Sequence, residues 1–148
     1  MGKAVVILAT IALMGCGGPA EPSLNTPQGY RQGTILRAER ISAIVNSANT
    51  SCMTGSVSEC QQALHDQESL YNQQPELAPL GGRPPACDHL ASNYFFLVAS
   101  AQDYFAKVKT SVAQHDQIAT RQAAQERMVS FNQSWNAFNE TVQVDSCR

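Results

Sequence analysis

Apolar residues recur every three or four positions in two blocks between Cys87 and Cys147, and this spacing predicts two amphipathic helices. No glycine or proline interrupts residues 88–146. The first block is Leu90, Tyr94, Leu97, Ala101, Phe105, Val108 and Val112, and the second is Ala124, Met128, Phe131, Trp135, Phe138 and Val142. In one straight helix, the step from Val112 to Ala124 would rotate the second stripe by about 120° from the first. One partner surface could not cover both stripes.

A turn near residues 114–117, the most polar point of this stretch, turns the two stripes toward each other. We therefore expect a long antiparallel helical hairpin over about 88–144, with helices at about 88–114 and 117–144. Position 117 is also the midpoint between Cys87 and Cys147. A turn there brings the two cysteines together at the open end of the hairpin.

Two further helices are expected upstream. The first spans about residues 34–52 and has a stripe of Ile35, Ala38, Ile41, Val45, Ala48 and Cys52, widened by Leu36 and Ile44. The second follows the capping-box sequence from Ser56 to Glu59 and ends before Pro75. The 148 residues are enough for one modest domain. The sequence therefore predicts an all-α, antiparallel up-down bundle of three to four helices over residues 34–148.

Four cysteines lie within the expected bundle, and an even number in an exported domain suggests two disulfides. Four cysteines permit three connectivities, which the expected order of the helices can rank. Cys52 and Cys60 flank one helix connection, whereas Cys87 and Cys147 lie at the other end of the bundle. We expect the pairs Cys52–Cys60 and Cys87–Cys147. The rival interpretation, a metal or redox site, is disfavoured because no C-x-x-C pair is present, and no metal is expected.

The first 15 residues have the composition of a secretory signal peptide. Lys3 is the one basic residue, and an apolar run from Ala4 to Met14 follows it. The run is short for a membrane-spanning helix. Export of the chain is therefore expected, with residues 1–15 removed.

The end of this leader, Leu13-Met14-Gly15-Cys16, resembles the lipobox of bacterial lipoproteins, although the family usually has Ala or Ser where this chain has Met14. The resemblance implies diacylation of the Cys16 thiol, cleavage before Cys16 and acylation of the new amino terminus. Two or more acyl chains hold a protein stably on a bilayer. The resemblance also implies a place in the bacterial cell envelope. In a cell with two membranes it favours the outer membrane, because Gly17 and not Asp follows the cysteine. An ordinary leader with Cys16 incidental remains the alternative.

Residues 16–33 follow as the lipidated cysteine and a tether rich in Gly, Pro and small polar residues. The alternative is an N-terminal arm that lies on the domain through Leu24 and Tyr30. The whole chain has 10 basic and 12 acidic residues, and removing residues 1–15 takes away Lys3, which leaves 9 against 12 and a net charge of −3. This balance, with no basic patch, excludes nucleic acid as an expected partner.

Candidate catalytic chemistry is weak. His65-Asp66 with Glu68, and Asp88-His89, are clusters of ligand type, but neither completes a di-iron, zinc-protease or nucleophile motif. We expect no enzyme activity and no cofactor.

Aromatic residues crowd the helix expected at 88–114. Phe95, Phe96 and Tyr104 lie partly outside its apolar stripe. We expect them in the core, under the two upstream helices. The alternative is a groove for a partner helix or an apolar ligand.

These features together predict a lipid-anchored, non-enzymatic helical bundle that acts as an accessory to another envelope protein. The alternative is a periplasmic or surface protein that holds an apolar or metal ligand between helices, using these aromatic residues or His65 and His89.

Overall fold

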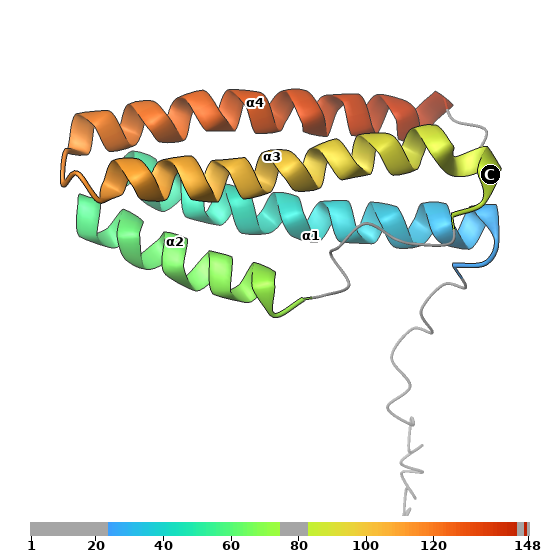
Figure 1. The fold of residues 1–148 in the computed structure, drawn as a ribbon, viewed down its shortest axis with the longest axis horizontal. Helices are drawn as coiled ribbons and strands as arrows, with labels where there is room; N and C mark the ends of the chain where they lie inside the picture. Colours follow the sequence, from blue (N-terminus) through green and yellow to red (C-terminus); the bar gives the residue numbers. More distant parts are fainter. Residues whose placement is uncertain (1–23, 75–82, 145–146, 148) are drawn as a thin grey trace, which may run out of the picture.

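The computed structural model of the protein describes residues 24–74, 83–144 and 147, which form an antiparallel helical bundle (Figure 1). Its helices are α1 (Pro27–Thr54), α2 (Val57–Asn72), α3 (Asp88–Val112) and α4 (Gln117–Val144), with a short 3-10 helix, η2 (Pro85–Cys87), before α3. The described residues contain no strand. The prediction of an all-α up-down bundle is confirmed. No described helix combines the length and the apolar character that crossing a bilayer requires.

The α3–α4 hairpin forms where the sequence predicted it. His115, in the turn, has a φ of 54°, and the chain reverses there. The Asp116 carboxylate then accepts hydrogen bonds from the backbone N–H groups of Ile118 (2.8 Å) and Ala119 (3.1 Å) at the start of α4. Since a helix leaves its first N–H groups without internal partners, this aspartate fixes the point at which α4 begins.

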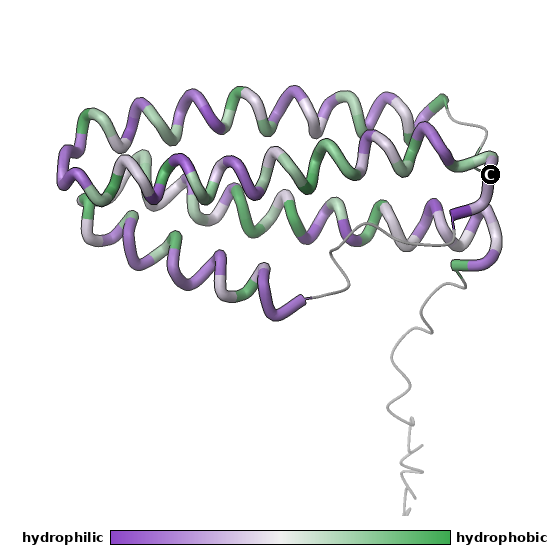
Figure 2. Tube along the Cα trace, in the orientation of Figure 1, coloured by the Kyte–Doolittle hydropathy of each residue, from purple (hydrophilic) through white to green (hydrophobic). Residues whose placement is uncertain are grey.

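The core is continuous along the hairpin and α1. In α3 the predicted stripe is buried over its whole length, and in α4 buried apolar side chains recur every seven residues at Ala124, Phe131 and Phe138. Tyr104 joins this core, and its hydroxyl donates a hydrogen bond of 3.2 Å to Asn49 of α1. Figure 2 shows apolar positions alternating with polar ones along each long helix, as expected for helices with one buried face.

Helix α1 begins earlier than the sequence suggested. It starts at Pro27 with Thr26 as its N-cap, whose hydroxyl accepts a hydrogen bond of 3.1 Å from the Gly29 N–H. The prediction of a tether through residue 33 was therefore wrong for residues 27–33, which are helical. Composition suggested a loop, but Thr-Pro is a favoured helix start. Tyr30 extends the buried stripe by one turn and is 1% exposed.

Both predicted disulfides, Cys52–Cys60 and Cys87–Cys147, are confirmed. Cys52–Cys60 joins α1 to α2 at what we call the turn end of the bundle, where the α3–α4 turn also lies (Figure 1). Cys87–Cys147 lies at the opposite, N-terminal end, where the Cys147 sulfur is 3.3 Å from the Pro27 carbonyl oxygen. This disulfide therefore closes the hairpin beside the start of α1.

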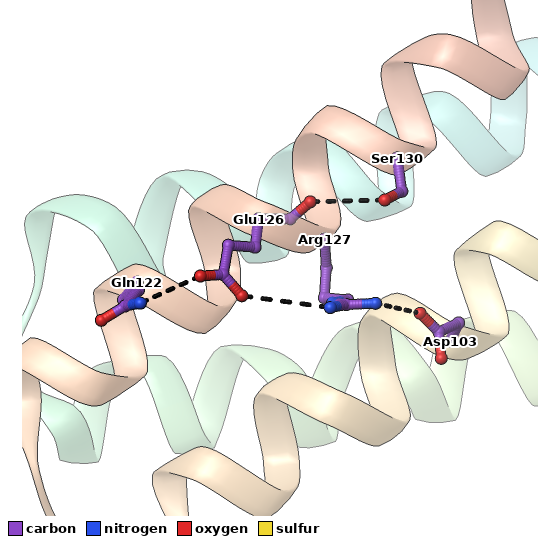
Figure 3. Close-up of polar contacts among 5 residues, drawn as sticks. All are labelled: Asp103, Gln122, Glu126, Arg127 and Ser130. Atoms are coloured by element: carbon purple, nitrogen blue, oxygen red, sulfur yellow. Dashed lines mark hydrogen bonds and ion pairs between the residues drawn. The ribbon is translucent and has the colours of Figure 1, made fainter.

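Polar contacts also cross from α3 to α4 on the surface (Figure 3). The Arg127 guanidinium lies 3.2 Å from the Asp103 carboxylate across the two helices and 3.9 Å from its neighbour Glu126. Gln122 donates to Glu126 at 2.9 Å. Because these groups are partly exposed, their contribution to stability is small, and the buried stripes hold the hairpin together.

Helix α2 is held differently from the other three. It starts with the predicted capping box, in which the Ser56 hydroxyl accepts from the Glu59 N–H and the Glu59 carboxylate accepts from the Ser56 N–H. Only Cys60 and Leu64 are buried along its 16 residues. In Figure 1, α2 diverges from α1 toward its C-terminal end and stops well short of the N-terminal end of the bundle.

Candidate functional site

Two adjacent phenylalanines near the start of α3 point out of the bundle. Phe95 is 55% exposed and Phe96 is 59% exposed, and their ring centroids lie 6.0 Å apart in an edge-to-face arrangement. The prediction that they pack in the core under the upstream helices was wrong. The physical reason is the length of α2, which ends at Asn72 before it can cover this part of α3. Tyr104, two turns further along, is buried as predicted.

A hollow of about 190 Å³ lies beside these rings. We call the residues that line it the aromatic patch: Tyr30, Arg83, Ala91, Ser92, Tyr94, Phe95 and Phe96. The two tyrosines are almost completely buried and form its base, whereas Arg83 lies on the exposed rim. The Arg83 Nε donates to the Asp88 carboxylate at 2.6 Å. The patch therefore combines an apolar interior with a charged edge.

The patch is uncharged at its base and carries an ion pair at its edge. Burial raises the pKa of the Tyr30 phenol above its usual range, and the nearby positive charges of Arg83 and Arg37 offset this only in part. The hydrogen bond with Asp88 raises the pKa of the Arg83 guanidinium. At physiological pH the Tyr30 phenol at the base of the patch is therefore uncharged. At the edge, the positive charge of Arg83 is paired with the negative charge of Asp88.

A second surface lies between α2 and α3, toward the turn end. It contains a hollow of about 290 Å³ and, beside it along α2, one of about 300 Å³. We call the residues that line both the α2 face: Gln61, Leu64, His65, Glu68, Ser69, Asn72, Gln73, Lys109, Val112 and Ala113. Lys109 of α3 reaches the Glu68 carboxylate at 2.7 Å. Leu64, Val112 and Ala113 give the first hollow an apolar lining, whereas the lining of the second is polar.

The structure separates the two histidines that the sequence offered as ligands. His65 lies on the α2 face, whereas His89 is exposed in the first turn of α3, at the N-terminal end. Among the residues that the structure describes, no group of three or more His, Cys, Asp or Glu side chains is placed to hold a metal ion. The four bundle cysteines form the two disulfides. Cys16, the predicted lipidation site, lies outside the described residues, as does the leader.

Sequence reasoning missed two members of the aromatic patch. Tyr30 was placed in the tether, although Thr26-Pro27 and the spacing of Tyr30 to Thr34 are both helix signals. Arg83 precedes two prolines in an irregular stretch, and nothing in its local sequence indicates that it meets Tyr30. Contacts of this kind follow from how helices are placed, which periodicity alone does not fix.

No protein-family model matches the chain, and neither a curated protein nor a solved structure shows detectable similarity to it. Function is therefore inferred from the leader residues and from the chemistry of the aromatic patch and the α2 face.

Proposed function

We propose that this protein is a lipid-anchored, non-enzymatic component of a bacterial cell envelope that binds another envelope protein through its α2 face. The observation that carries the proposal is the loose packing of α2, which buries only Cys60 and Leu64 and borders two hollows. Elements that bind partners are often the less stably packed parts of a fold. The rest of the bundle serves as the support for this helix.

The chemistry of the α2 face suits a protein partner. Glu68, Lys109 and His65 provide charge and hydrogen bonding, while Leu64, Val112 and Ala113 line the hollow with apolar groups. Interfaces commonly combine an apolar centre with a polar rim. The Cys52–Cys60 disulfide and the capping box fix the start of the helix. A partner therefore meets a helix whose position is already restricted, which lowers the entropic cost of binding.

The proposal of a non-enzymatic role is supported by the causes of the altered pKa values. Burial is the main cause for Tyr30, Tyr71 and Tyr104, whereas local hydrogen bonds act on Glu59 and Arg83. These shifts accompany packing, helix capping and an ion pair. The Ser56 hydroxyl that donates to Glu59 belongs to the capping box at the start of α2.

The leader supplies the location in this proposal. Cys16 carries the acyl chains, and Gly17 favours transfer to the outer membrane where the cell has two membranes. Mass spectrometry of the N-terminal peptide tests the first point directly: a diacylated thiol and an acylated amino terminus on Cys16 are expected. An unmodified Cys16 would contradict the anchor.

Crosslinking and affinity capture of the tagged full-length protein from native membranes tests the partner. We expect one partner in stoichiometric amount with the wild type and with Val129→Glu, a control that introduces a charge at an exposed position of α4. His65→Glu, at the exposed residue that lines both hollows, and Cys16→Ala should each lose it. Recovery with His65→Glu at the wild-type level would exclude the α2 face as the docking surface, and circular dichroism would verify that each variant is folded.

A further inference from the structure

We infer that the aromatic patch contacts the surface of the lipid bilayer and sets the orientation of the bundle on the membrane. The inference rests on the proposed lipid anchor but concerns a different surface from the one proposed to bind a protein. Phe95 and Phe96 are the exposed rings that would enter the interface between lipid headgroups and acyl chains.

The length of chain between the anchor and α1 keeps the patch near the bilayer. Ten residue steps separate Cys16 from Thr26, the N-cap of α1, and a fully extended chain of this length spans at most about 35 Å. Tyr30, which lines the hollow, lies in the first turn after this cap. Phe95 and Phe96 lie about 10–12 Å along α3 from Asp88, at the same end of the bundle. The anchor therefore brings this end, and not the turn end, to the membrane.

The composition of the patch suits this contact. Aromatic rings are favoured at membrane–water interfaces, and the strength of such binding increases with the apolar area that is buried. Two adjacent and more than half-exposed phenylalanines provide that area. Arg83 and Asp88, which form an ion pair on the rim, give the patch a polar edge at the level of the lipid headgroups.

The distribution of charge along the helices supports the same orientation. Helix α1 carries Arg31, Arg37 and Arg40 against Glu39, a sum of +2, and all four lie in its first half. Helix α2 carries Glu59, Asp66 and Glu68 and no Lys or Arg, a sum of −3. Arg83, Asp88 and Glu140 lie at the same end as the first half of α1 and change the sum there from +2 to +1. An anionic membrane surface attracts this end and repels α2.

Tryptophan fluorescence of the full-length lipidated protein in vesicles of phosphatidylethanolamine and phosphatidylglycerol tests the inference. Trp135→Phe first removes the native fluorophore, and Phe96→Trp then reports on the patch. Val129→Trp on α4 is the matched control, because Val129 is 53% exposed. With lipids brominated on their acyl chains, we expect emission from position 96 to shift to shorter wavelength and to be strongly quenched. Emission from position 129 should show neither change.

Each other outcome overturns the inference. Equal quenching at both positions would show that the bundle has no preferred face toward the lipid. Unquenched emission at position 96, with Cys16 acylated, would overturn this contact while leaving the anchor and the α2 face untouched. A blue shift at position 96 that occurs only in native membranes would assign the patch to a protein. An unmodified Cys16 removes the basis of the inference, and Phe95→Trp provides an independent reporter should Phe96→Trp fold poorly.

Discussion

The α3–α4 hairpin and α2 belong to the same bundle but are held in it by different means. The hairpin buries an apolar stripe along both helices, and its base is closed by Cys87–Cys147. Helix α2 buries two residues and depends on Cys52–Cys60, a capping box and the ion pair between Lys109 and Glu68. In this fold, the continuous core and the loosely packed surface therefore belong to different helices.

The cause of the difference lies in the length and apolar density of each segment. The hairpin has room for about seven helical turns on each side, whereas Gly55 and Pro75 limit α2 to 16 residues. Because α2 is short, no helix among the described residues covers the start of α3 on that side, and Phe95 and Phe96 remain exposed. A short helix thus creates both a loosely packed face and an aromatic patch.

The largest change in the free energy of unfolding is expected from removing a buried aromatic side chain of the hairpin. Phe131 is completely buried, so Phe131→Ala should lower the free energy of unfolding by about 3–5 kcal/mol through lost burial and a residual cavity. Leu70→Ala on α2 should cost below about 1 kcal/mol, because the side chain is already 44% exposed. Urea titrations followed by circular dichroism measure both. Equal losses would contradict the division between rigid hairpin and loose α2.

The two disulfides should stabilise the protein to different extents. On the chain-entropy model, Cys87–Cys147, with a sequence separation of 60, stabilises by about 4 kcal/mol. Cys52–Cys60, with a separation of 8, stabilises by about 2.5 kcal/mol. Replacing each pair by serine and comparing urea midpoints separates the contributions. A larger loss from the shorter loop would show that α2 stabilises the bundle more than its burial indicates.

The capping box makes α2 sensitive to mild acid. Ser56→Ala should cost about 1 kcal/mol, as is usual for loss of an N-cap hydroxyl. In the wild type, the hydrogen bond from the Ser56 N–H holds the pKa of the Glu59 carboxyl below its ordinary value of 4.5. Ionised Glu59 therefore stabilises the fold fully above about pH 4.5, and this contribution disappears as the pH falls through the lowered pKa.

Glu59→Gln separates this effect from the titration of other carboxyl groups. The difference in unfolding free energy between wild type and Glu59→Gln should be present at pH 6 and should shrink progressively below pH 4.5. Urea titrations at several pH values would measure it. A difference that stays constant as the pH falls would exclude this carboxylate as the source.

The smallest effect on stability is expected where the rings are most exposed. Phe95→Ser with Phe96→Ser should change the free energy of unfolding by less than about 1 kcal/mol, because these side chains contribute little to the core. Tyr94 is the buried neighbour of these two residues. Tyr94→Ser is therefore the matched control and should be strongly destabilising. Loss of folding in the double variant would place the two rings in the core after all.

Local sequence determined most of this fold. Helical spacing, the position of glycines and prolines, and the capping box located α2, α3 and α4 to within about two residues. The same map ranked the disulfides, because antiparallel helices place Cys87 beside Cys147 and Cys52 beside Cys60. These features depend on interactions within a few turns, so a single sequence carries them.

The start of α1 and the aromatic patch could not be predicted in the same way. Residues 27–33 resemble a loop in composition, yet burial of Tyr30 against the bundle makes them helical. Exposure of Phe95 and Phe96 depends on where α2 stops and on the direction it takes, which are tertiary properties. The sequence shows where the aromatic residues lie along the chain, but it does not indicate which side of the bundle remains uncovered.

The Cys52–Cys60 bond has a mechanical consequence. A pull between a membrane anchor before α1 and a partner held on α2 would be transmitted along α1 and through this covalent link, leaving residues 53–59 outside the load path. Because α1 and α2 lie side by side and antiparallel, the same force would load the contacts between these two helices in shear along the length of α2. Helices α3 and α4 would stay outside the load path.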